Sequence, residues 1–429
     1  MTPERLRILY VSQIPASPPR SGAQARIHGL MTQLALHHAI TAVSLIDDEF
    51  DAEECRRAMR EYCHDVVLVP NPNGPRGASK RMLQLRSLAS SRSFERHLYH
   101  VPKLQESLDR TLATERFDLV NVEFPYLAHL RLRRSPPGTT PPALVLDSHE
   151  IAYDLGRQIA RRGGVARRVY GDLNWRKLRR EERRAFRVAD GVYLCSVADQ
   201  ARLLADVPSA RTAVIPNAAD VEFFQPRRSD PAPDDRTVVF FGHLSTVPNI
   251  DGATFLAKEI WPLVAVARPD ARCRIIGPRA HSSVRKLAGP GVEVLGPVDD
   301  LRPHLASAAL AVVPLRIGGG TRLKIVEAMA MGKPIVSTAL GAEGIDAVAG
   351  RDILIADEPT SFAAAVIRAL DDAALRTRLG HAARELAVER YSWAAAASRL
   401  ERFFGEILEG TAVPNRRATA DRAPQQVVT

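Results

Sequence analysis

The sequence contains no long hydrophobic run. A membrane-spanning helix needs about 18 or more consecutive apolar residues, and no segment of this chain approaches that length. The first residues, MTPERLRILYVSQIP, pass from charged side chains directly into a short apolar stretch. They lack the apolar core and small-residue cleavage site of an export signal. We therefore expect a cytoplasmic protein that does not span a membrane.

Cysteine is scarce and scattered. The four cysteines of the 429-residue chain are Cys55, Cys63, Cys195 and Cys273, and their spacing fits neither a zinc site nor a disulfide framework. We expect free thiols in a reducing compartment. The GxGxxG signature of a dinucleotide site is also missing from the chain, which removes the usual sequence evidence for a nicotinamide or flavin cofactor.

The composition is that of an ordinary globular protein, with 45% hydrophobic and 25% charged residues. A chain of this length exceeds what one hydrophobic core usually supports, so two domains are expected. The net charge of +10 favours anionic partners, such as nucleotide phosphates, acidic membrane surfaces or nucleic acid. Most of the cations are arginines, a bias that a genome rich in G and C also produces, so charge alone assigns no function.

Short apolar runs alternate with helical patterns along the chain. The first run, RILYVSQ, precedes a Pro-rich loop and a helix predicted over 24–37, and a stretch dense in proline and charge, 225–237, separates two such series. Alternating strands and helices predict parallel βαβ units, so we expect an α/β fold with two doubly wound sheets. The other expected strands are ITAVSLI, DVVLVP, FDLVNVE, PPALVLDSHE and ADGVYLCS in the first series, where TAVIPNAADVEFFQP also has the strand pattern, and TVVFFG, CRIIG, VEVLG, ALAVVPL, KPIVST and DILIA in the second.

The segment PLRIGGGTRLKIVEAMAMGKPIVST is the first candidate site, because ligands of open parallel sheets bind where strands end. Gly318, Gly319 and Gly320 follow a buried strand, Thr321 is a possible N-cap of the next helix, and Gly332 is expected to end that helix in a left-handed conformation. Such glycines let backbone N–H groups approach an anion.

Two cations, Arg322 and Lys324, stand at the same helix N-terminus. Cations there oppose the helix dipole unless an anion lies between them, which favours a phosphate ligand. A flexible turn with two solvated cations explains the spacing equally well. Glu327, within an apolar run of the helix, can accept hydrogen bonds from a vicinal diol such as a ribose, or it can pair with Lys324 three residues earlier.

Four other strand ends carry polar or small residues. Ser21 and Gly22 lie in the loop after the first strand, where backbone N–H groups could approach a ligand, and His149 follows LVLDS, where it could contact a sugar hydroxyl or move a proton. A structural histidine is the alternative. Asn217 and Asp220 follow a third strand, and Gly242 with His243 follows the first strand of the second series. Turn formation is the default explanation for these last residues.

Together these segments resemble the nucleotide-sugar glycosyltransferases of the GT-B fold, glycosyltransferase family 4. The most specific parts are GGGTRLKIVEAMAMGKPIVST, VIPNAADVEFFQP and ADGVYLCSVAD, and the resemblance extends from RILYVSQ to about Phe404. It implies two Rossmann-like domains facing one another across a cleft. The implied division is an acceptor-side domain over 1–215, a linker over 216–236, a donor-binding domain over 237–385, a helix over 386–410 that crosses back to the first domain, and a disordered tail over 411–429.

The resemblance implies a retaining glycosyltransferase that needs no metal or other cofactor. The donor would be a nucleotide-diphosphate sugar, and the acceptor a glycan, a lipid-linked saccharide or a small molecule, in cell-surface polysaccharide or glycoconjugate synthesis. A nucleotide-sugar 2-epimerase on the same fold is the alternative, and a non-catalytic anion-binding module ranks below it. No nucleic-acid partner is expected, because a recognition helix, a zinc pattern and an aromatic β-platform are all missing.

Site roles carry over by position. The resemblance implies that Glu327 holds the donor ribose, that Gly318 to Thr321 lie along the diphosphate and sugar, and that Gly22, Gly242 and His149 line the cleft. Three positions depart from the family: Gly319 replaces a common glutamate, His243 and Asn249 stand where an arginine and a lysine are usual, and Ser21-Gly22 replaces a double glycine. We therefore expect Arg322 and Lys324 to supply the missing charge and, with His149, to act in catalysis.

The segment 157–187 is strongly basic and carries interleaved Tyr170, Leu173, Trp175 and Leu178. A cationic amphipathic helix of this kind suits weak docking on the inner, anionic face of the cell membrane. The alternative is a solvated surface helix whose glutamates and arginines pair three or four residues apart.

Overall fold

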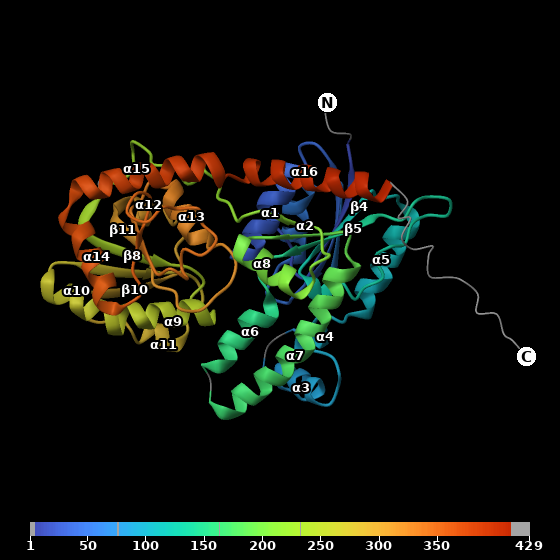
Figure 1. The fold of residues 1–429 in the computed structure, drawn as a ribbon, viewed down its shortest axis with the longest axis horizontal. Helices are drawn as coiled ribbons and strands as arrows, with labels where there is room; N and C mark the ends of the chain where they lie inside the picture. Colours follow the sequence, from blue (N-terminus) through green and yellow to red (C-terminus); the bar gives the residue numbers. More distant parts are fainter. Residues whose placement is uncertain (1–4, 75–76, 163, 232, 413–429) are drawn as a thin grey trace, which may run out of the picture.

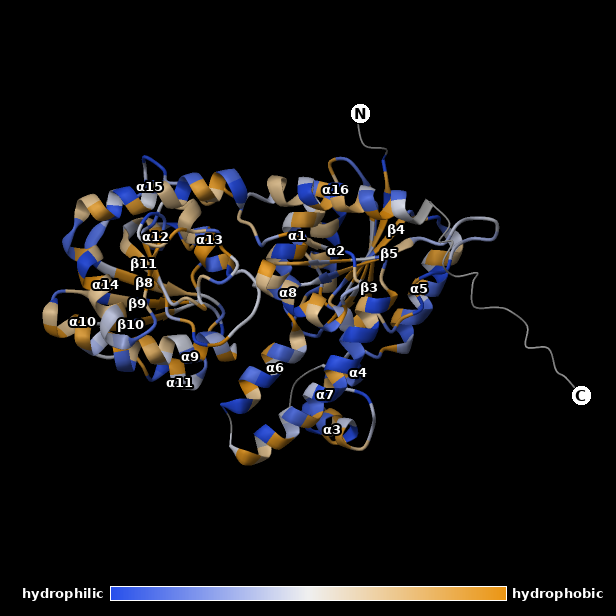
Figure 2. Ribbon diagram, in the orientation of Figure 1, coloured by the Kyte–Doolittle hydropathy of each residue, from blue (hydrophilic) through white to orange (hydrophobic). Residues whose placement is uncertain are grey.

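The computed structural model describes residues 5–74, 77–162, 164–231 and 233–412. Two α/β domains lie side by side, and two consecutive helices, α15 (Ala373–Arg390) and α16 (Trp393–Ala412), run along the top of the molecule, one over each domain (Figure 1). Each domain is built on one parallel sheet, and the strands of both sheets are predominantly apolar (Figure 2). The predicted fold class is confirmed.

The N-terminal sheet has seven strands in the order β3-β2-β1-β4-β5-β6-β7. Each strand that the sequence predicted for this domain is present. All but the two edge strands of this sheet are buried on both faces, which requires continuous apolar runs and makes them visible in the sequence. They are β1 (Arg7–Ser12), β2 (Ala39–Ile46), β3 (Asp65–Pro70), β4 (Leu119–Glu123), β5 (Ala143–Ser148), β6 (Gly191–Leu194) and β7 (Thr212–Val214).

The C-terminal sheet has six strands in the order β10-β9-β8-β11-β12-β13. Its first strand begins at Asp234, inside the predicted linker 216–236, because the charged residues before TVVFF already pair with the neighbouring strand, Asp234 opposite Ala308. The interdomain connection is therefore shorter than predicted. The strands are β8 (Asp234–Phe241), β9 (Arg272–Ile276), β10 (Val292–Gly296), β11 (Ala308–Val313), β12 (Ile335–Ser337) and β13 (Leu354–Ile355).

Helices cover both faces of each sheet, as right-handed βαβ crossovers require. The N-terminal domain has α1 (Gly22–Leu34), α2 (Ala52–Arg60), α3 (Gly77–Leu88), α4 (Phe94–Leu98), α5 (Pro102–Thr114), the 3₁₀ turn η1 (Pro125–Leu127), α6 (Ala152–Arg161), α7 (Val165–Val188) and α8 (Val197–Asp206). The C-terminal domain has α9 (Val247–Phe255), η2 (Leu256–Ile260), α10 (Trp261–Ala267), α11 (Ser282–Arg285), α12 (Arg302–Ser307), α13 (Leu323–Ala330), α14 (Pro359–Asp371) and α15 (Ala373–Arg390).

The last described helix, α16 (Trp393–Ala412), leaves the C-terminal domain and packs on the N-terminal one (Figure 1). Its apolar side chains join the core between the N-terminal sheet and α1. Gly29 of α1 permits this contact, because a Cβ atom there would lie 2.3 Å from the Trp393 ring. The crossing helix begins at Trp393 and not at 386, since residues up to Arg390 continue α15. Most of the predicted tail, 413–429, lies outside the described residues.

The basic segment 157–187 is divided between two helices, α6 and α7, that project from the N-terminal domain together with α3 (Figure 1). The two helices touch where Gly171 faces Ala160, since a Cβ atom on Gly171 would lie 2.1 Å from Cβ of Ala160. At the tip, Arg162 donates hydrogen bonds to Asp251 (2.8 Å) and to the carbonyl of Arg316 (3.0 Å). The projection therefore contacts both domains.

Candidate active site between the two domains

The carboxyl ends of both sheets face the interdomain cleft, and two helix N-termini meet there. Helix α1 begins at Gly22, earlier than the predicted start at residue 24, because the Ser21 hydroxyl caps the N–H of Gln24. A Cβ atom on Gly22 would lie 3.2 Å from Cδ1 of Leu323, the first residue of α13. The structure therefore places Gly22 where the N-terminal domain contacts the start of α13.

The predicted glycine loop follows β11 and lies against the N-terminal domain. Gly320, with φ of 68°, adopts a left-handed conformation, and a Cβ atom there would lie 2.5 Å from the carbonyl oxygen of His149. Its N–H donates to Asp199 Oδ2 (3.1 Å), and the N–H of Gly318 donates to Gln158 Oε1 (3.2 Å). Gly319 lies beside Glu150, where a Cβ atom would be 3.3 Å from that of the glutamate.

Thr321 joins the domains and does not cap the helix. Helix α13 begins at Leu323, with Arg322 as its N-cap and no side-chain cap hydrogen bond, so the predicted capping role is wrong. The Thr321 hydroxyl donates instead to the carbonyl of Cys195 (2.6 Å), and Asn217 Nδ2 donates to the carbonyl of Thr321 (2.7 Å). Asn217, which the sequence indicated only as a turn residue, thus fixes the loop from the N-terminal side.

Arg322 is a buried guanidinium without an ion-pair partner among the described residues. It donates to the carbonyls of Gly320 (2.6 Å) and Leu340 (3.5 Å), and its Nε has no partner. Burial lowers the pKa of Arg322, although Glu150 and other carboxylates nearby oppose this. Gly318 makes room for the side chain, because a Cβ atom at Gly318 would lie 2.7 Å from Arg322 Nη2. A buried charge of this kind is stabilised when an anion binds beside it.

Lys324 stands two residues further along the chain, and its side chain reaches the end of β8. Its Nζ donates to Asn249 Oδ1 (2.6 Å) and lies 4.5 Å from the centroid of the Phe240 ring. Gly242 leaves space for it, since a Cβ atom there would lie 2.8 Å from Nζ. Burial and then repulsion from Arg322 lower the pKa of Lys324 to about 7. The structure thus brings Gly242, Asn249 and the two predicted cations together.

Glu327 lies one turn after Lys324 on α13, and its carboxylate forms no hydrogen bond or ion pair with any described residue. The ion pair with Lys324 that the spacing allowed is therefore not formed. Burial raises the pKa of Glu327 to about 7, and Lys324 opposes the rise. An unpartnered carboxylate at this position is free to accept hydrogen bonds from a ligand.

His149 belongs to a buried cluster at the ends of β4 and β5. Its Nε2 lies 2.8 Å from Glu123 Oε2 and 3.4 Å from Asp147 Oδ2, and no described residue contacts its Nδ1 by a hydrogen bond. Arg26 of α1 forms a two-pronged ion pair with Asp147, at 2.8 and 3.1 Å. The Phe124 ring packs on His149 with a centroid separation of 4.0 Å, held by a positive φ of 67° that is rare for a residue with a side chain.

The cluster keeps His149 charged at neutral pH. Burial alone would lower its pKa, but Asp147 and Glu123 raise it to about 9. Burial raises the pKa of Glu123 to about 7, whereas Arg26 overcomes the effect of burial and lowers that of Asp147. His149 is therefore a cationic donor and not a free base at pH 7. The sequence indicated His149 and the polar ends of both strands, but not their union with Arg26.

Glu123, Asp147 and His149 offer ligand atoms that all lie within 4.8 Å of one another, a separation that a metal ion could bridge. The carboxylates already have other partners, however. Arg26 occupies both oxygens of Asp147, and Asn121 Nδ2 donates to Glu123 Oε1 (2.9 Å). The set is therefore poorly suited to a divalent cation, and independence from metal stays a prediction.

Comparisons with known proteins agree with this architecture. Residues 49–223 match the family model described as Glycosyltransferase Family 4, and residues 235–372 match that of Glycosyl transferases group 1. The phosphatidyl-myo-inositol mannosyltransferase of Mycobacterium tuberculosis is 32% identical over 207 residues, which cover 45% of this chain and 53% of that protein. The chain spans about half, or less, of the length of the curated relatives it matches.

Solved structures share the fold. HepE of Anabaena, in complex with UDP and glucose, has a TM-score of 0.63 and 16% identity, and the match covers 94% of this chain and 100% of that one. Sucrose-phosphate synthase of Thermosynechococcus elongatus has a TM-score of 0.70 and 17% identity, covering 95% and 100%. The two family models and the shared fold support a GT-B glycosyltransferase.

Proposed function

We propose that this chain, a GT-B glycosyltransferase by its fold and family models, moves a sugar from a nucleotide-diphosphate donor to a saccharide or lipid-linked acceptor in polysaccharide or glycolipid synthesis. The observation that carries this proposal is Arg322, a buried guanidinium with no carboxylate partner among the described residues, beside the weakly stabilised ammonium of Lys324. A diphosphate between them and the N-terminus of α13 would satisfy both charges and the helix dipole.

In this proposal the GGTRLK segment is the donor site. Arg322, Lys324 and the N–H groups at the start of α13 stabilise the negative charge that grows on the diphosphate as the sugar leaves. Glu327 accepts hydrogen bonds from the ribose hydroxyls. The loop from Gly318 to Thr321 and the glycines Gly22 and Gly242 keep the cleft narrow enough for backbone N–H groups to reach the donor.

His149 would face the donor sugar. Its Nε2 is committed to Glu123, which leaves Nδ1 to donate to a sugar hydroxyl. A charged histidine on this side, together with cations behind the diphosphate, suits departure of the leaving group and attack of the acceptor on one face of the sugar. The configuration at the anomeric carbon would then be retained, without a metal ion.

The acceptor would enter through a cavity of about 800 Å³ beside the cleft. Its walls come from the ends of β2 and β3 and from Arg279 of the C-terminal domain, whose guanidinium lies 2.7 Å from Glu49. The lining is rich in carboxylates, including Asp48 and Glu106. Carboxylates accept hydrogen bonds from hydroxyl groups, so this cavity favours the hydroxyl-bearing part of a saccharide.

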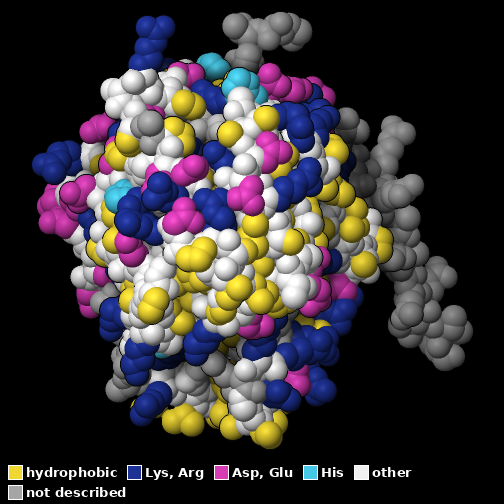
Figure 3. Space-filling view, turned by 90° about the vertical axis from the view of Figure 1, so that its left-hand side faces the viewer, with side chains coloured by type: hydrophobic (Ala, Val, Ile, Leu, Met, Phe, Trp, Pro, Cys, Tyr) yellow, Lys and Arg dark blue, Asp and Glu magenta, His cyan; other side chains and the backbone are white. Residues whose placement is uncertain are grey.

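Membrane contact would be peripheral. No helix in the part of the chain that the structure describes is long and apolar enough to cross a bilayer. The projecting helices nevertheless expose apolar side chains among their arginines, as the lower end of the molecule in Figure 3 shows. Such a surface suits docking at the inner face of the cell membrane. The exposed residues are Met82, Leu85 and Leu88 of α3 and Val165, Val169 and Leu173 of α7.

Co-sedimentation with vesicles of phosphatidylcholine, with and without anionic lipid, tests the docking at two salt concentrations. We expect the double variant Val165→Asp/Val169→Asp to bind anionic vesicles less well than the wild type. Val266→Asp is the matched control, since Val266 is 84% exposed on the C-terminal domain. Equal binding by all three proteins would contradict the docking proposal.

A panel of nucleotide sugars tests the function itself. One donor should raise the melting temperature, because a ligand that binds only the folded state stabilises it, and this rise should shrink in Glu327→Gln. Nucleotide release that requires a saccharide acceptor supports transfer. Isomerisation of the donor without acceptor would indicate the epimerase, which the comparisons do not favour, and stabilisation without turnover would indicate a binding module.

A further inference from the structure

A second, basic pocket lies in the N-terminal domain between α4, η1 and α7, with a volume of about 450 Å³. It is separate from the cleft and from the acidic cavity described above. The turn η1 forms one wall and follows directly from the end of β4. The lining residues are Ser91, Arg92, Arg96, Pro125, Tyr126, Ala128, His129, Arg180, Glu181, Arg184, Ala185 and Val188.

Four arginines and a single carboxylate make up the charged lining. The carboxylate, that of Glu181, accepts from both the N–H and the hydroxyl of Ser93, at 3.1 and 2.5 Å. It is thus engaged with the backbone at the start of α4. The guanidinium groups of Arg92, Arg96 and Arg184 form no ion pair with any described residue. The pocket therefore carries an uncompensated positive charge.

Two nitrogen atoms in the pocket wall are buried without a partner. They are Nε of Arg96 and Nε2 of His129. The other ring nitrogen of His129 lies 2.7 Å from the carbonyl of Tyr126, to which it donates, so the ring is fixed. Burial and then the charge of Arg96 lower the pKa of His129 to about 3, which reflects the same positive field.

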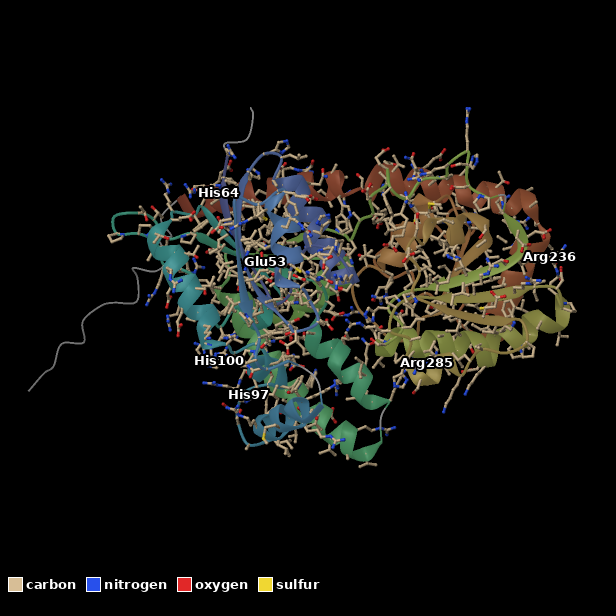
Figure 4. The ribbon with its side chains drawn as sticks, turned by 180° about the vertical axis from the view of Figure 1, so that it is seen from behind. Glu53, His64, His97, His100, Arg236 and Arg285 are labelled. Atoms are coloured by element: carbon tan, nitrogen blue, oxygen red, sulfur yellow. The ribbon has the colours of Figure 1, made fainter. Side chains whose placement is uncertain are left out.

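The pKa values of two neighbouring histidines are lowered as well, in part by the same arginines. Burial and then Arg92 and Arg96 lower the pKa of His100, and burial with nearby arginines lowers that of His97. His97 belongs to α4, and His100 lies two residues after its end (Figure 4). Burial is the largest cause of the lowered pKa of all three histidines, and the nearby arginines lower it further. Guanidinium groups gathered around one cavity are costly unless an anion compensates their charge.

We propose that this pocket binds a phosphate-bearing group, such as a phosphate monoester or a diphosphate. Several guanidinium groups around one cavity match the multiple oxygens and charges of phosphate better than a single carboxylate, because each planar fork donates two parallel hydrogen bonds. Arg180 is held in place by its bond to the carbonyl of Ser91 (2.6 Å), which leaves the pocket partly preorganised.

The pocket also touches the cleft through a stack of rings. Tyr126 lies in its wall and stacks on Phe124 with a centroid separation of 5.2 Å, and Phe124 packs on His149 at 4.0 Å. A phosphate in the pocket would therefore sit behind the side chains that hold the cleft histidine. Its source could be a lipid headgroup or a soluble phosphorylated compound, and the two share the same chemistry.

Calorimetric titration of the full chain with inorganic pyrophosphate tests the proposal. We expect two binding steps, one in the cleft and one in the basic pocket. Arg96→Gln/Arg184→Gln should weaken one step about tenfold or more, as expected for losing charge-assisted hydrogen bonds. Arg176→Gln/Arg187→Gln removes the same charge from exposed positions of α7 outside the pocket and should change neither step by more than about twofold.

Arg322→Gln should weaken the other binding step, the one assigned to the cleft. Loss of that step alone tests the donor site, and loss of the first step alone tests the basic pocket, so the two proposals can fail separately. If Arg96→Gln/Arg184→Gln lowers the melting temperature, the rim pair Arg92→Gln/Arg184→Gln replaces it. Pyrophosphate binding that survives unchanged in folded pocket variants would overturn the proposal.

Vesicles of phosphatidylcholine with and without phosphatidic acid distinguish the two sources. A larger loss of vesicle binding in the pocket pair than in the α7 control pair identifies a lipid headgroup as the ligand. Equal vesicle binding by the two pairs, with pyrophosphate binding weakened only in the pocket pair, identifies a soluble phosphate. Equal behaviour of both pairs in both measurements contradicts a phosphate site.

Discussion

The two sides of the cleft hold their charges in opposite ways. On the N-terminal side, Arg26, Asp147, His149 and Glu123 form one connected set in which each charge has a partner. On the C-terminal side, Arg322 and Glu327 have no ion-pair partner among the described residues, and the Lys324 ammonium contacts an amide oxygen and the Phe240 ring but no carboxylate among those residues. The first arrangement is complete without a ligand. In the second, burying charges without ion-pair partners costs free energy, and a bound charged ligand would lower that cost.

The largest effect on activity should come from substitutions on the C-terminal side, where Arg322 has no ion-pair partner among the described residues. Arg322→Gln/Lys324→Gln should lower kcat/KM by about 10²–10³ or more, because in the proposed donor site these side chains would stabilise the leaving diphosphate. The melting temperature should stay unchanged or rise, since the substitution removes two buried like charges. Lys286→Gln, at an exposed position of the same domain, is the control. A variant that loses stability and keeps activity would reverse the comparison.

Substitutions on the N-terminal side, where each charge has a partner, should change the stability of the protein. Arg26→Met leaves the buried Asp147 carboxylate uncompensated, so the free energy of unfolding should fall by about 3–5 kcal/mol. Denaturant titration measures this change. Arg26→Met/Asp147→Leu removes both charges and should recover part of the loss, although His149 then loses one partner. No recovery in the double variant would mean that the ion pair is not the origin of the stability.

These two sides also differ in how far the sequence predicts them. Arg322, Lys324 and Glu327 lie within six residues on one helix, so their relation follows from helical spacing alone. The strands were equally easy to predict from the sequence, because buried parallel strands are continuous apolar runs. The union of Arg26 with Asp147 joins residues 121 positions apart, and no local pattern encodes it.

Other features were missed for the same reason. The hydroxyl of Thr321 bonds to the carbonyl of Cys195, 126 positions away, so the capping role that its local sequence suggested was wrong. The positive φ of Phe124 is a property of tertiary packing, and the sequence did not single this residue out. The basic pocket depends on α4 and α7 lying together, which neither segment reveals alone.

The protonation of His149 gives a smaller effect, in the pH dependence of stability. Its pKa in the folded chain is raised to about 9, against about 6.5 in an unfolded chain. The stabilisation is therefore fully present below about pH 6.5, decreases as the pH rises, and is lost above about pH 9. Glu123, with a pKa raised to about 7, titrates below most of this window.

Unfolding measured between pH 7 and 9.5 checks this expectation. The free energy of unfolding of the wild type should fall across the window and level off near pH 9, whereas His149→Gln should lack that fall. Parallel curves for the two proteins would show that His149 does not carry the extra proton. The N-terminal cluster would then be less tightly coupled than its geometry indicates.

The smallest expected effect is that of a chelator, and it tests the comparison most directly. Glu123, Asp147 and His149 could bridge a metal ion by distance, but Arg26 and Asn121 already donate to the carboxylates. If the cluster neutralises itself, dialysis against EDTA should leave transfer activity within about twofold of the untreated enzyme, because direct ion pairing with Arg26 replaces a cation. Loss of activity that added Mg²⁺ or Mn²⁺ restores would instead make the N-terminal side, like the C-terminal one, a set of charges that is completed only by a ligand.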